Sequence, residues 1–427
     1  MGRCWSPASR DSVRRMDTTP FTSPNGPTRR RMLGAALALG AAAPLGLAST
    51  ARAEAPTPPS STPGPAAGRL TLPGPTGPHR VGTAALHLRD TSRPDPFAGP
   101  GRYRELMASV WYPAERADEL PLAPWMTDGA MRAYLDDFGF KLPLSATPLT
   151  AGHLGAPVHR TGHRTGHRLP VVVYSHGAHS HRAINTVTVQ ELASHGYVVV
   201  TVDHTWDAFT EFPDGRVLTP WIDGAPRLGP RDYAADARFV LDCVEEIAAG
   251  RNPDMDGKPL PDGLLGAPDP LDVGMFGWSK GGSATAAVTM ADRRVRAGLS
   301  IDGPMQAITV TDLDRPFLML TAEFGRDQNP DAVTFWNHLR GWRRNIQADG
   351  VRHSSYSDAA PLMPQVAELL GLPAQQVQQM VGTLPADSSV RIQQAYPLAF
   401  FDLHLRHRRG SLLDGPSPRF PDVKFLP

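Results

Sequence analysis

A serine between closely spaced glycines is the clearest chemical feature of this 427-residue sequence. Gly277, Ser279 and Gly281 form the pattern Gly-x-Ser-x-Gly, which is short enough to arise by chance in a chain with 40 glycines. Its context is more informative, because a strand-like run at 272–276 precedes the pattern and small residues at 283–287 follow it. Strand, sharp turn and helix are the setting in which such a serine is strained and exposed as a nucleophile. We therefore expect Ser279 to attack a carbonyl carbon.

A nucleophilic serine needs a base, and histidine is the usual one near neutral pH. Four histidines follow Ser279 in the chain: His338, His353, His404 and His407. His353 lies in an expected loop after a strand, whereas the other three lie in segments with helical character. A loop lets the imidazole reach the serine, take its proton and later give it to the leaving group. His353 is therefore the predicted base.

The third residue of such a triad is a carboxylate that holds the histidine in the required tautomer. Asp302 follows the strand-like run 298–301, and Glu323 and Asp327 follow the run 317–320. The acid can follow either of two successive strands, so all three remain candidates on pattern alone. The pattern slightly favours the later position.

Two backbone N–H groups are expected to bind the oxyanion that forms on the substrate. Lys280 follows the nucleophile at the start of a helix, and Ala178 follows the apolar run 169–174 at the position where a second donor is required. His176 is expected to order this loop by hydrogen bonding rather than to transfer protons. The side chains that could line the substrate pocket, or pack instead, are His176, Trp206, Phe209 and Trp278.

Strand-like and helix-like runs alternate along residues 79–427, which predicts a mostly parallel sheet with helices on both faces. Strands are expected at 81–88, 105–112, 169–174, 197–202, 271–276, 295–301 and 316–321, and in a short segment before His353. Helices are expected at 183–195, 233–247, 331–342 and 391–406. The first two strands are expected near an edge. Together with the serine motif, this order predicts an α/β-hydrolase fold.

Two segments fit this scheme poorly. Residues 125–140, within a candidate cap segment at 119–150, are either a cap over the active site or a packed surface helix. The tandem repeat from His159 to Arg168 contains imidazoles that could bind a metal. A repeat of four residues in a glycine-containing loop fixes no tetrahedral geometry, so a solvated loop is favoured and no metal is expected.

The N-terminal residues have the pattern of an export signal. Arg29, Arg30 and Arg31 precede an uncharged stretch, and a small-x-small cleavage pattern ends at Ala53. Residues 1–53 are therefore predicted to be a twin-arginine signal peptide, with a retained membrane anchor as the alternative. Residues rich in Pro, Ser and Thr at 54–78 predict a flexible linker, followed by a catalytic domain at 79–427.

The composition argues against a nucleic-acid-binding function. With 43 basic and 42 acidic residues, the chain lacks the basic excess of a nucleic-acid-binding protein. Cleavage of the signal would leave Cys243 as the only thiol, so no internal disulfide is expected. The expected chemistry requires no cofactor. An ester substrate, transient contact with a lipid surface and no obligate protein partner are expected.

At these residues the chain resembles the plasma-type (isoform II) platelet-activating factor acetylhydrolase family, which comprises serine lipases of the α/β-hydrolase fold. The segments 174–177, 299–305 and 353–358 resemble the oxyanion loop, the acid segment and the base motif of that family. The resemblance implies that Asp302 is the acid and that Glu323 is not. The chain departs from the family at Trp278 and Lys280, where family members often have a histidine and a bulky apolar residue.

The function expected from these features is ester hydrolysis through an acyl-enzyme by a secreted bacterial serine hydrolase. The resemblance implies short-acyl lipids or phospholipids as substrates. Gly-Trp-Ser-x-Gly-Gly also resembles cutinases and polyester hydrolases, which keep their acid on the later strand, so a cutinase-like esterase or lipase acting on polyesters or triglycerides is an alternative. A catalytically silent hydrolase fold that serves as a binding protein is an alternative of another class.

Overall fold

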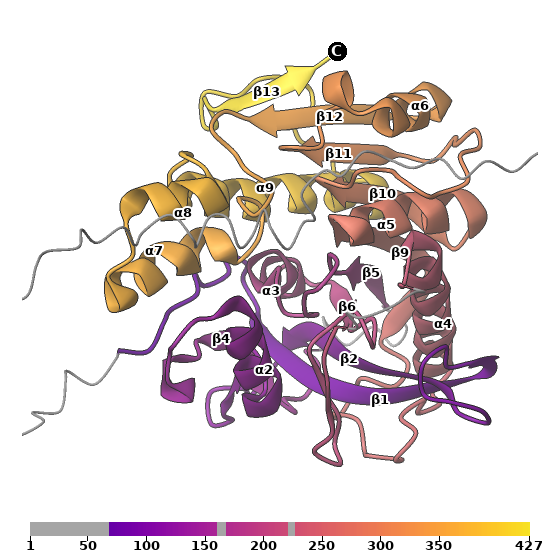
Figure 1. Cartoon of the computed structure of the whole chain (residues 1–427). Helices are drawn as coiled ribbons and strands as arrows, with labels where there is room; N and C mark the ends of the chain where they lie inside the picture. The colour runs from indigo at the N-terminus through magenta and orange to yellow at the C-terminus, as the bar shows by residue number, and fades with distance from the viewer. Residues whose placement is uncertain (1–67, 160–167, 221–226) are drawn as a thin grey trace, which may run out of the picture. The chain divides into compact units, whose positions relative to one another are not determined.

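One large sheet organises the chain in a computed structural model, which describes residues 68–159, 168–220 and 227–427. Within these residues the sheet has 11 strands in the order β13-β12-β11-β10-β9-β5-β6-β2-β1-β4-β3 (Figure 1). Its strands are β1 (Arg80–Pro94), β2 (Tyr103–Ala114), β3 (Leu122–Pro124), β4 (Leu149–Leu154), β5 (Leu169–Ser175), β6 (Val198–Val202), β9 (Pro268–Trp278), β10 (Val295–Ile301), β11 (Phe317–Thr321), β12 (Arg343–Ala348) and β13 (Val423–Leu426). A separate hairpin pairs β7 (Thr210–Glu211) with β8 (Val217–Leu218).

The six neighbouring strands β6, β5, β9, β10, β11 and β12 in the middle of the sheet run parallel. Val171 and Val173 of β5 belong to one hydrophobic cluster, whereas Val172 and Tyr174 belong to another. Successive side chains of a strand point to opposite faces, so a strand covered on both sides needs an unbroken apolar run. This requirement explains the continuous apolar runs of the sequence.

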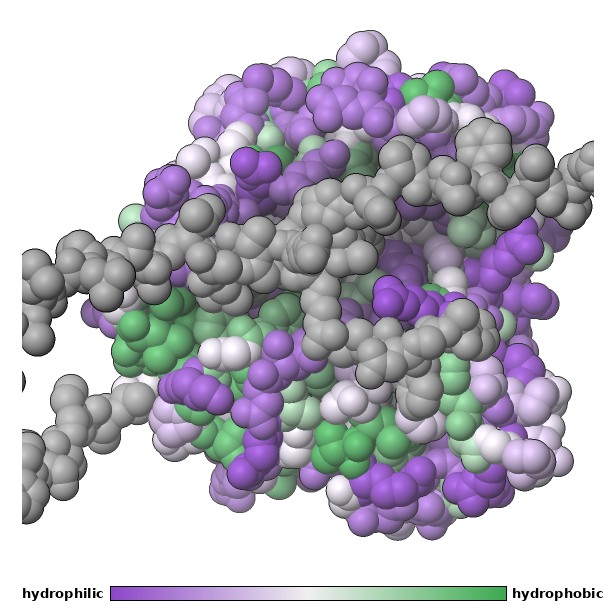
Figure 2. All heavy atoms as spheres, viewed as in Figure 1, coloured by the Kyte–Doolittle hydropathy of each residue, from purple (hydrophilic) through white to green (hydrophobic). Residues whose placement is uncertain are grey.

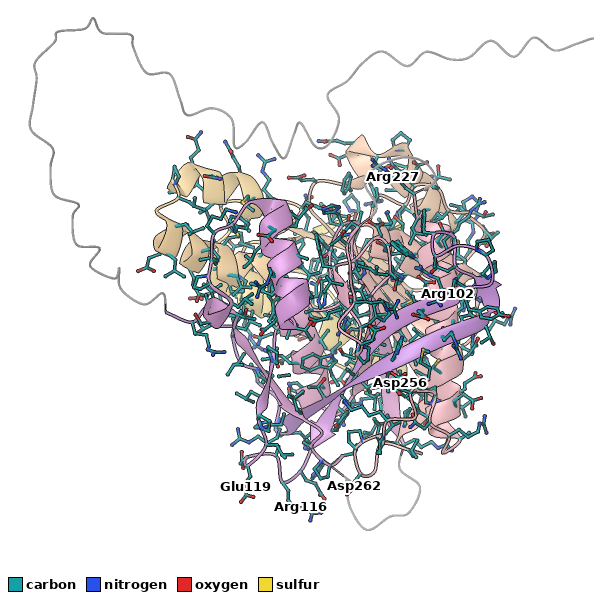
Figure 3. The ribbon with its side chains drawn as sticks, turned by 60° about the horizontal axis from the view of Figure 1, so that its bottom comes forward. Arg102, Arg116, Glu119, Arg227, Asp256 and Asp262 are labelled. Carbon is teal, nitrogen blue, oxygen red and sulfur yellow. The ribbon has the colours of Figure 1, made fainter. Side chains whose placement is uncertain are left out.

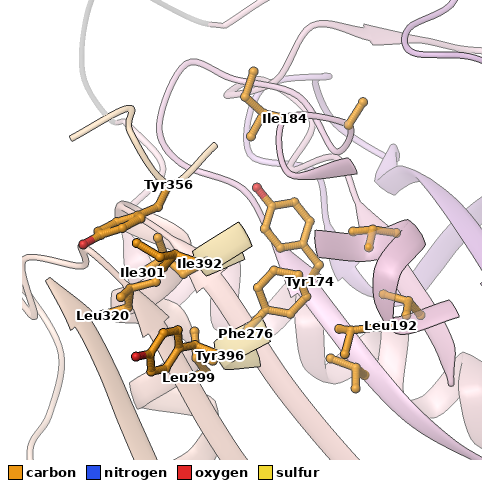
Figure 4. Packing of buried hydrophobic residues seen from close by; sticks show 14 of the residues in the cluster. Tyr174, Ile184, Leu192, Phe276, Leu299, Ile301, Leu320, Tyr356, Ile392 and Tyr396 are labelled. Carbon is orange, nitrogen blue, oxygen red and sulfur yellow. The ribbon is translucent and has the colours of Figure 1, made fainter. Parts of the chain in front are cut away.

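Helices cover the two faces of the sheet. Those described are α2 (Asp128–Phe138), α3 (Thr186–Ser194), α4 (Pro230–Ala248), α5 (Lys280–Ala291), α6 (Pro330–His338), α7 (Ala359–Leu370), α8 (Ala374–Val381) and α9 (Ala386–Leu405), with short 3-10 helices η1 (Leu144–Ala146) and η2 (Arg326–Gln328). Helices α4 and α5 lie on one side, and α7, α8 and α9 lie on the other (Figure 1). In the core, Tyr174 and Phe276 pack with ring centroids 4.7 Å apart, near Ile392 and Tyr396 of α9 (Figure 4). The arrangement is the predicted α/β-hydrolase fold.

The structure corrects the expected elements in three places. The strands β1 and β2 lie between β6 and β4 rather than at an edge, because β3 and β4, which were not expected, extend the sheet beyond β1. Helix α6 ends at His338 rather than at residue 342, since the chain must turn there to begin β12 at Arg343. Helices α7 and α8 and strand β13 were not expected from the sequence.

The prediction of a flexible linker at 54–78 is wrong for residues 68–78. Leu70 is 3% exposed in the main hydrophobic cluster, and its N–H donates to the carbonyl of Ala146 at 3.0 Å. Thr76 donates to the carboxylate of Glu191 on α3 at 2.6 Å. Tertiary hydrogen bonds and one buried leucine therefore order residues 68–78 despite their loop-like composition.

Side chains of both charge signs lie at the surface, as Arg116, Glu119, Asp256 and Asp262 illustrate (Figure 3). Hydrophobic and hydrophilic residues are interspersed on the face seen in Figure 2. None of the helices in the described part of the chain is both long and apolar enough to span a bilayer. The predicted signal peptide and residues 160–167 of the histidine repeat lie outside the described residues.

Candidate active site

Ser279 occupies a strained turn between β9 and α5. Its backbone has φ 57° and ψ −122°, a conformation that costs a non-glycine residue on the order of 1–3 kcal/mol. A Cβ atom on Gly277 would lie 2.2 Å from the carbonyl oxygen of Gly281, and one on Gly281 would lie 2.0 Å from that of Ser175. Only glycine fits at these two positions, so the flanking glycines are a steric requirement of the turn. Ser279 itself is half-buried.

The carboxylate of Asp302 and the imidazole of His353 are in direct contact. Nδ1 of His353 lies 2.6 Å from Oδ2 of Asp302, and the Asp302 side chain is completely buried. The carboxylate also accepts backbone N–H bonds from Ala322 at 2.7 Å, Glu323 at 3.2 Å and Phe324 at 2.9 Å. A His353 tautomer that donates from Nδ1 to Asp302 leaves Nε2 free to accept a proton.

The nucleophile lies beside this pair. The N–H of Ser279 donates to the carbonyl of Ile301 at 2.8 Å, next to Asp302 in the chain. The indole of Trp278 stacks on the His353 ring with centroids 4.8 Å apart, and its Nε1–H donates to the His353 carbonyl at 2.9 Å. The structure therefore brings Ser279, Asp302 and His353 together at the carboxyl ends of β9 and β10.

The other candidates for the acid and the base lie in different surroundings. Glu323 faces Arg352 at 3.4 Å with its side chain 42% exposed, and Asp327 lies in η2. His338 on α6 pairs with Asp312 at 2.7 Å. None of these contacts involves His353 or Asp302, so the geometry favours the earlier strand for the acid.

The loop after β5 lies against the nucleophile. A Cβ atom on Gly177 would lie 2.6 Å from the Trp278 ring and 3.0 Å from Cβ of Ser279, so backbone rather than a side chain approaches the serine here. Ala178 follows directly. Lys280 is the first residue of α5, and N–H groups in the first turn of a helix have no partner within that helix. Both predicted oxyanion donors are thus placed next to Ser279.

His176 orders this loop, as expected. Its Nε2 accepts from the N–H of His204 at 2.9 Å, and its Nδ1 lies 2.6 Å from the carbonyl of Gly177. Burial lowers the pKa of His176 to about 3, so the ring is neutral at working pH. An imidazole that is completely buried, neutral and hydrogen-bonded at both nitrogens has a structural role and is not a proton shuttle.

Trp206 and Phe209 have packing partners of their own. The Nε1–H of Trp206 donates to Asp95 at 2.9 Å, and its ring packs against Phe97. Phe209 is fully buried, with its ring centroid 5.3 Å from that of His179. The side chain of His179 also pairs with Asp137 on α2 at 2.6 Å. Helix α2 of the candidate cap segment therefore adjoins the oxyanion loop.

A chain of buried polar groups supports the end of β5. Oγ of Ser175 lies 2.7 Å from Nε2 of His204, and Nδ1 of His204 lies 3.0 Å from Asp236 on α4. The guanidinium of Arg104 donates two hydrogen bonds to Asp236, at 3.0 and 2.8 Å. Burial by itself would raise the pKa of Asp236, but the charge of Arg104 and the hydrogen bonds from His204 and Arg104 hold it well below its ordinary value.

Asp236→Asn is expected to lower the free energy of unfolding by about 3–5 kcal/mol at pH 7, because it removes the closest counter-charge of the buried Arg104 guanidinium and leaves only Asp95, at 3.5 Å. The ionised Asp236 stabilises the fold fully above the ordinary pKa of 3.8. This contribution is lost as the pH falls, so wild type should lose more stability than the variant between pH 6 and pH 3. Urea denaturation at both pH values measures this, with the exposed Asp118→Asn as control. Equal losses in wild type and variant would contradict the prediction.

Sequence reasoning assigned no role to three residues near the site, although one of them, Asp358, ends the segment 353–358 that resembles the base motif of the family. Phe324 packs its ring edge-on against His353 at 5.1 Å. Asp358 accepts N–H bonds from Thr186 at 2.9 Å and from Val187 at 3.0 Å, so it joins the base loop to the start of α3. Asp207 follows β6 and contacts both oxyanion segments. Its place after the carboxyl end of a parallel strand was the available signal.

Two cavities formed by the described residues, of about 520 and 610 Å³, lie away from the site. One cavity of about 520 Å³ is lined by α9 residues such as Leu398 and Asp402 and by Glu191. Its lining includes neither Ser279 nor His353. No group of three or more His, Cys, Asp or Glu side chains suited to hold a metal ion occurs in the described ranges.

Comparison with known proteins gives three similarities. Residues 66–210 match the family model described as platelet-activating factor acetylhydrolase, isoform II. A protein of Arthroderma benhamiae described as a probable 1-alkyl-2-acetylglycerophosphocholine esterase is 26% identical over 380 residues, which are 83% of this chain and 93% of the relative. The solved structure of a ferulic acid esterase from Streptomyces cinnamoneus is 31% identical with a TM-score of 0.70, over 84% of this chain and 100% of that chain.

Proposed function

Because this chain belongs to the platelet-activating factor acetylhydrolase-like family and is a carboxylic-ester hydrolase, we propose that it cleaves esters through an acyl-enzyme on Ser279. His353 is the proposed base, and Asp302 holds it in place. The Ala178 and Lys280 N–H groups are the proposed oxyanion donors. The observation that supports this mechanism best is the hydrogen bond from His353 to the buried Asp302 beside the strained Ser279.

In the proposed reaction, the Ser279 hydroxyl passes its proton to Nε2 of His353 as its oxygen bonds to the ester carbonyl carbon. The displaced π electrons form an oxyanion, which the two N–H donors stabilise. Collapse of this intermediate breaks the bond to the alcohol, which leaves with the proton from His353. Water then attacks the acyl-enzyme, again giving a proton to His353, and the carboxylic acid is released as Ser279 recovers its proton.

Short-acyl lipids or phospholipids are the proposed substrates. The family-model match and the fungal relative's description support this class. Aromatic carboxylic esters are a second candidate, favoured by the ferulic acid esterase likeness and by the rings of Trp278 and Phe324 against the base. Flat rings near the reacting carbonyl could stack on an aromatic acyl group.

A substrate panel separates these candidates. We expect kcat/KM for 1-alkyl-2-acetyl phosphocholine to exceed the values for methyl ferulate and tributyrin by at least about 10-fold, since binding contacts to the correct acyl and alcohol groups lower the barrier. Faster hydrolysis of methyl ferulate would favour the aromatic class. Fast turnover of tributyrin or an aliphatic polyester would favour a cutinase-like enzyme. No turnover of any ester, with no labelling by an active-site phosphonate, would favour a binding protein.

We also propose export by the twin-arginine route, on the basis of the arginines at 29–31 and the uncharged stretch after them. Changing Arg29, Arg30 and Arg31 together to lysine should keep the protein uncleaved and inside the cell. N-terminal sequencing of exported material should begin at Glu54 if the predicted cleavage position is correct.

A further inference from the structure

We propose that Asp207 is a positioning residue that holds together the two backbone segments of the oxyanion hole. This inference rests on the proposed serine mechanism and extends it to a carboxylate that takes no part in proton transfer. One segment contains Ala178 after β5, and the other contains Lys280 at the start of α5. The two segments are about a hundred residues apart in sequence, so a tertiary contact has to set their spacing.

The carboxylate of Asp207 contacts both segments directly. Its Oδ1 accepts the backbone N–H of His179, the residue after Ala178, at 2.9 Å. Its Oδ2 accepts from the ammonium of Lys280, whose own backbone N–H is the second proposed donor. Each oxygen therefore holds one side of the oxyanion hole.

Further contacts fix the carboxylate and its partner. The hydroxyl of Tyr233 donates to Oδ2 of Asp207 at 3.0 Å, and the N–H of Asp207 donates to the carbonyl of His204 at 2.8 Å. The ammonium of Lys280 also donates to the carbonyl of Leu228 at 2.7 Å. The side chains of Lys280 and Asp207 are only 20% and 14% exposed. A pair shielded in this way is screened less by salt than a surface pair.

Oxyanion stabilisation depends on donor position within a few tenths of an ångström, and loss of one donor costs roughly 10²–10³ in kcat. A lysine after the nucleophile departs from the bulky apolar residue of the family that the chain resembles. A lysine in a partly buried place needs a counter-charge, and Asp207 supplies it. The ion pair thus ties the start of α5 to the loop after β5.

The test uses Asp207→Asn, Lys280→Met and the double variant. Asparagine keeps the size and one acceptor, but its NH2 group cannot accept from Lys280. The measurements are kcat and KM for p-nitrophenyl acetate, the pH profile of kcat/KM, and the Ki of an aryl trifluoromethyl ketone, which binds as an oxyanion. We expect Asp207→Asn to lower kcat by about 10- to 100-fold and to raise the Ki of the ketone by a similar factor. KM should change less than about 2-fold, and the pH midpoint should not move.

Because the two side chains act as a unit, the double variant should lose about as much as the worse single variant rather than the product of both losses. Asp292→Asn is the matched control, since Asp292 is 8% exposed, pairs with Arg294 at 2.7 Å and follows the far end of α5. It should lower the melting temperature without changing the Ki of the ketone.

Two results would overturn the inference, and they distinguish a failure of the serine mechanism from a failure of the positioning role. Wild type that fails to react with a phosphonate would refute the serine mechanism and this inference with it. Wild type that reacts normally, with Asp207→Asn unchanged in kcat or reduced in kcat without weaker ketone binding, would refute the positioning role alone.

Discussion

Replacing Ser279 with alanine is expected to lower kcat for a soluble ester by about 10⁴-fold or more, because no other group can form the acyl-enzyme. The strained turn around residue 279 does not depend on the hydroxyl. Alanine can adopt the same backbone, so the variant should fold. Stopped assays with a chromogenic acetate ester and labelling by a fluorescent phosphonate measure the two consequences.

Ser283→Ala provides the matched control for this loss. Ser283 lies one turn further along α5 and is fully buried, with its Oγ accepting the N–H of Met305 at 2.9 Å. This variant should lose some stability but keep phosphonate labelling. If Ser279→Ala retained labelling, another residue would be the nucleophile and the proposed mechanism would fail.

Asp302→Asn is expected to lower kcat by about 10⁴-fold while leaving the fold intact. The amide can still accept N–H bonds from the turn after β11, but it can donate to Nδ1 of His353, which favours the tautomer with the proton on Nε2. That tautomer cannot take the proton from Ser279. The neutral amide also fails to stabilise the imidazolium that forms during attack.

Glu323→Gln is the comparison for Asp302→Asn, since Glu323 follows β11, where the alternative acid position lies. Its side chain is 42% exposed and pairs only loosely with Arg352 at 3.4 Å. We expect its kcat to stay within about 2-fold of wild type, because an exposed pair of this kind contributes little. A large loss in Glu323→Gln together with a small loss in Asp302→Asn would assign the acid to the later strand.

The aromatic surroundings of His353 bear on the substrate. Trp278 stacks on the ring, and Phe324 meets it edge-on. Packing on two sides limits the rotation of the imidazole, so the hydrogen bond to Asp302 is not the only restraint on the base. The same rings leave an aromatic surface beside the nucleophile, which is why aromatic and acetyl esters need to be compared directly.

Local sequence patterns were enough to predict the central strands, the turn at Ser279 and the candidate base. The continuous, mostly β-branched runs of β5 and β6 predicted buried parallel strands, because a strand covered on both faces has no polar side. The glycines around Ser279 predicted a turn in which a side chain cannot fit, and the structure shows the backbone contacts that exclude one. His353 stood out because it lies in a loop rather than in a helix.

Only the tertiary structure decided what depends on contacts between distant segments. Spacing left Asp302, Glu323 and Asp327 open and the family resemblance pointed to Asp302; the structure shows that Asp302 is the carboxylate in contact with His353, which lies 51 residues later. Order in residues 68–78 comes from contacts with α3 and α9, which local composition does not encode. The contacts of Asp207 with His179 and Lys280 likewise arise because the segments after β5, β6 and β9 meet at the carboxyl ends of these neighbouring strands. Short-range propensity fixes strands and turns, whereas the partner of a buried charge is set by the folded chain.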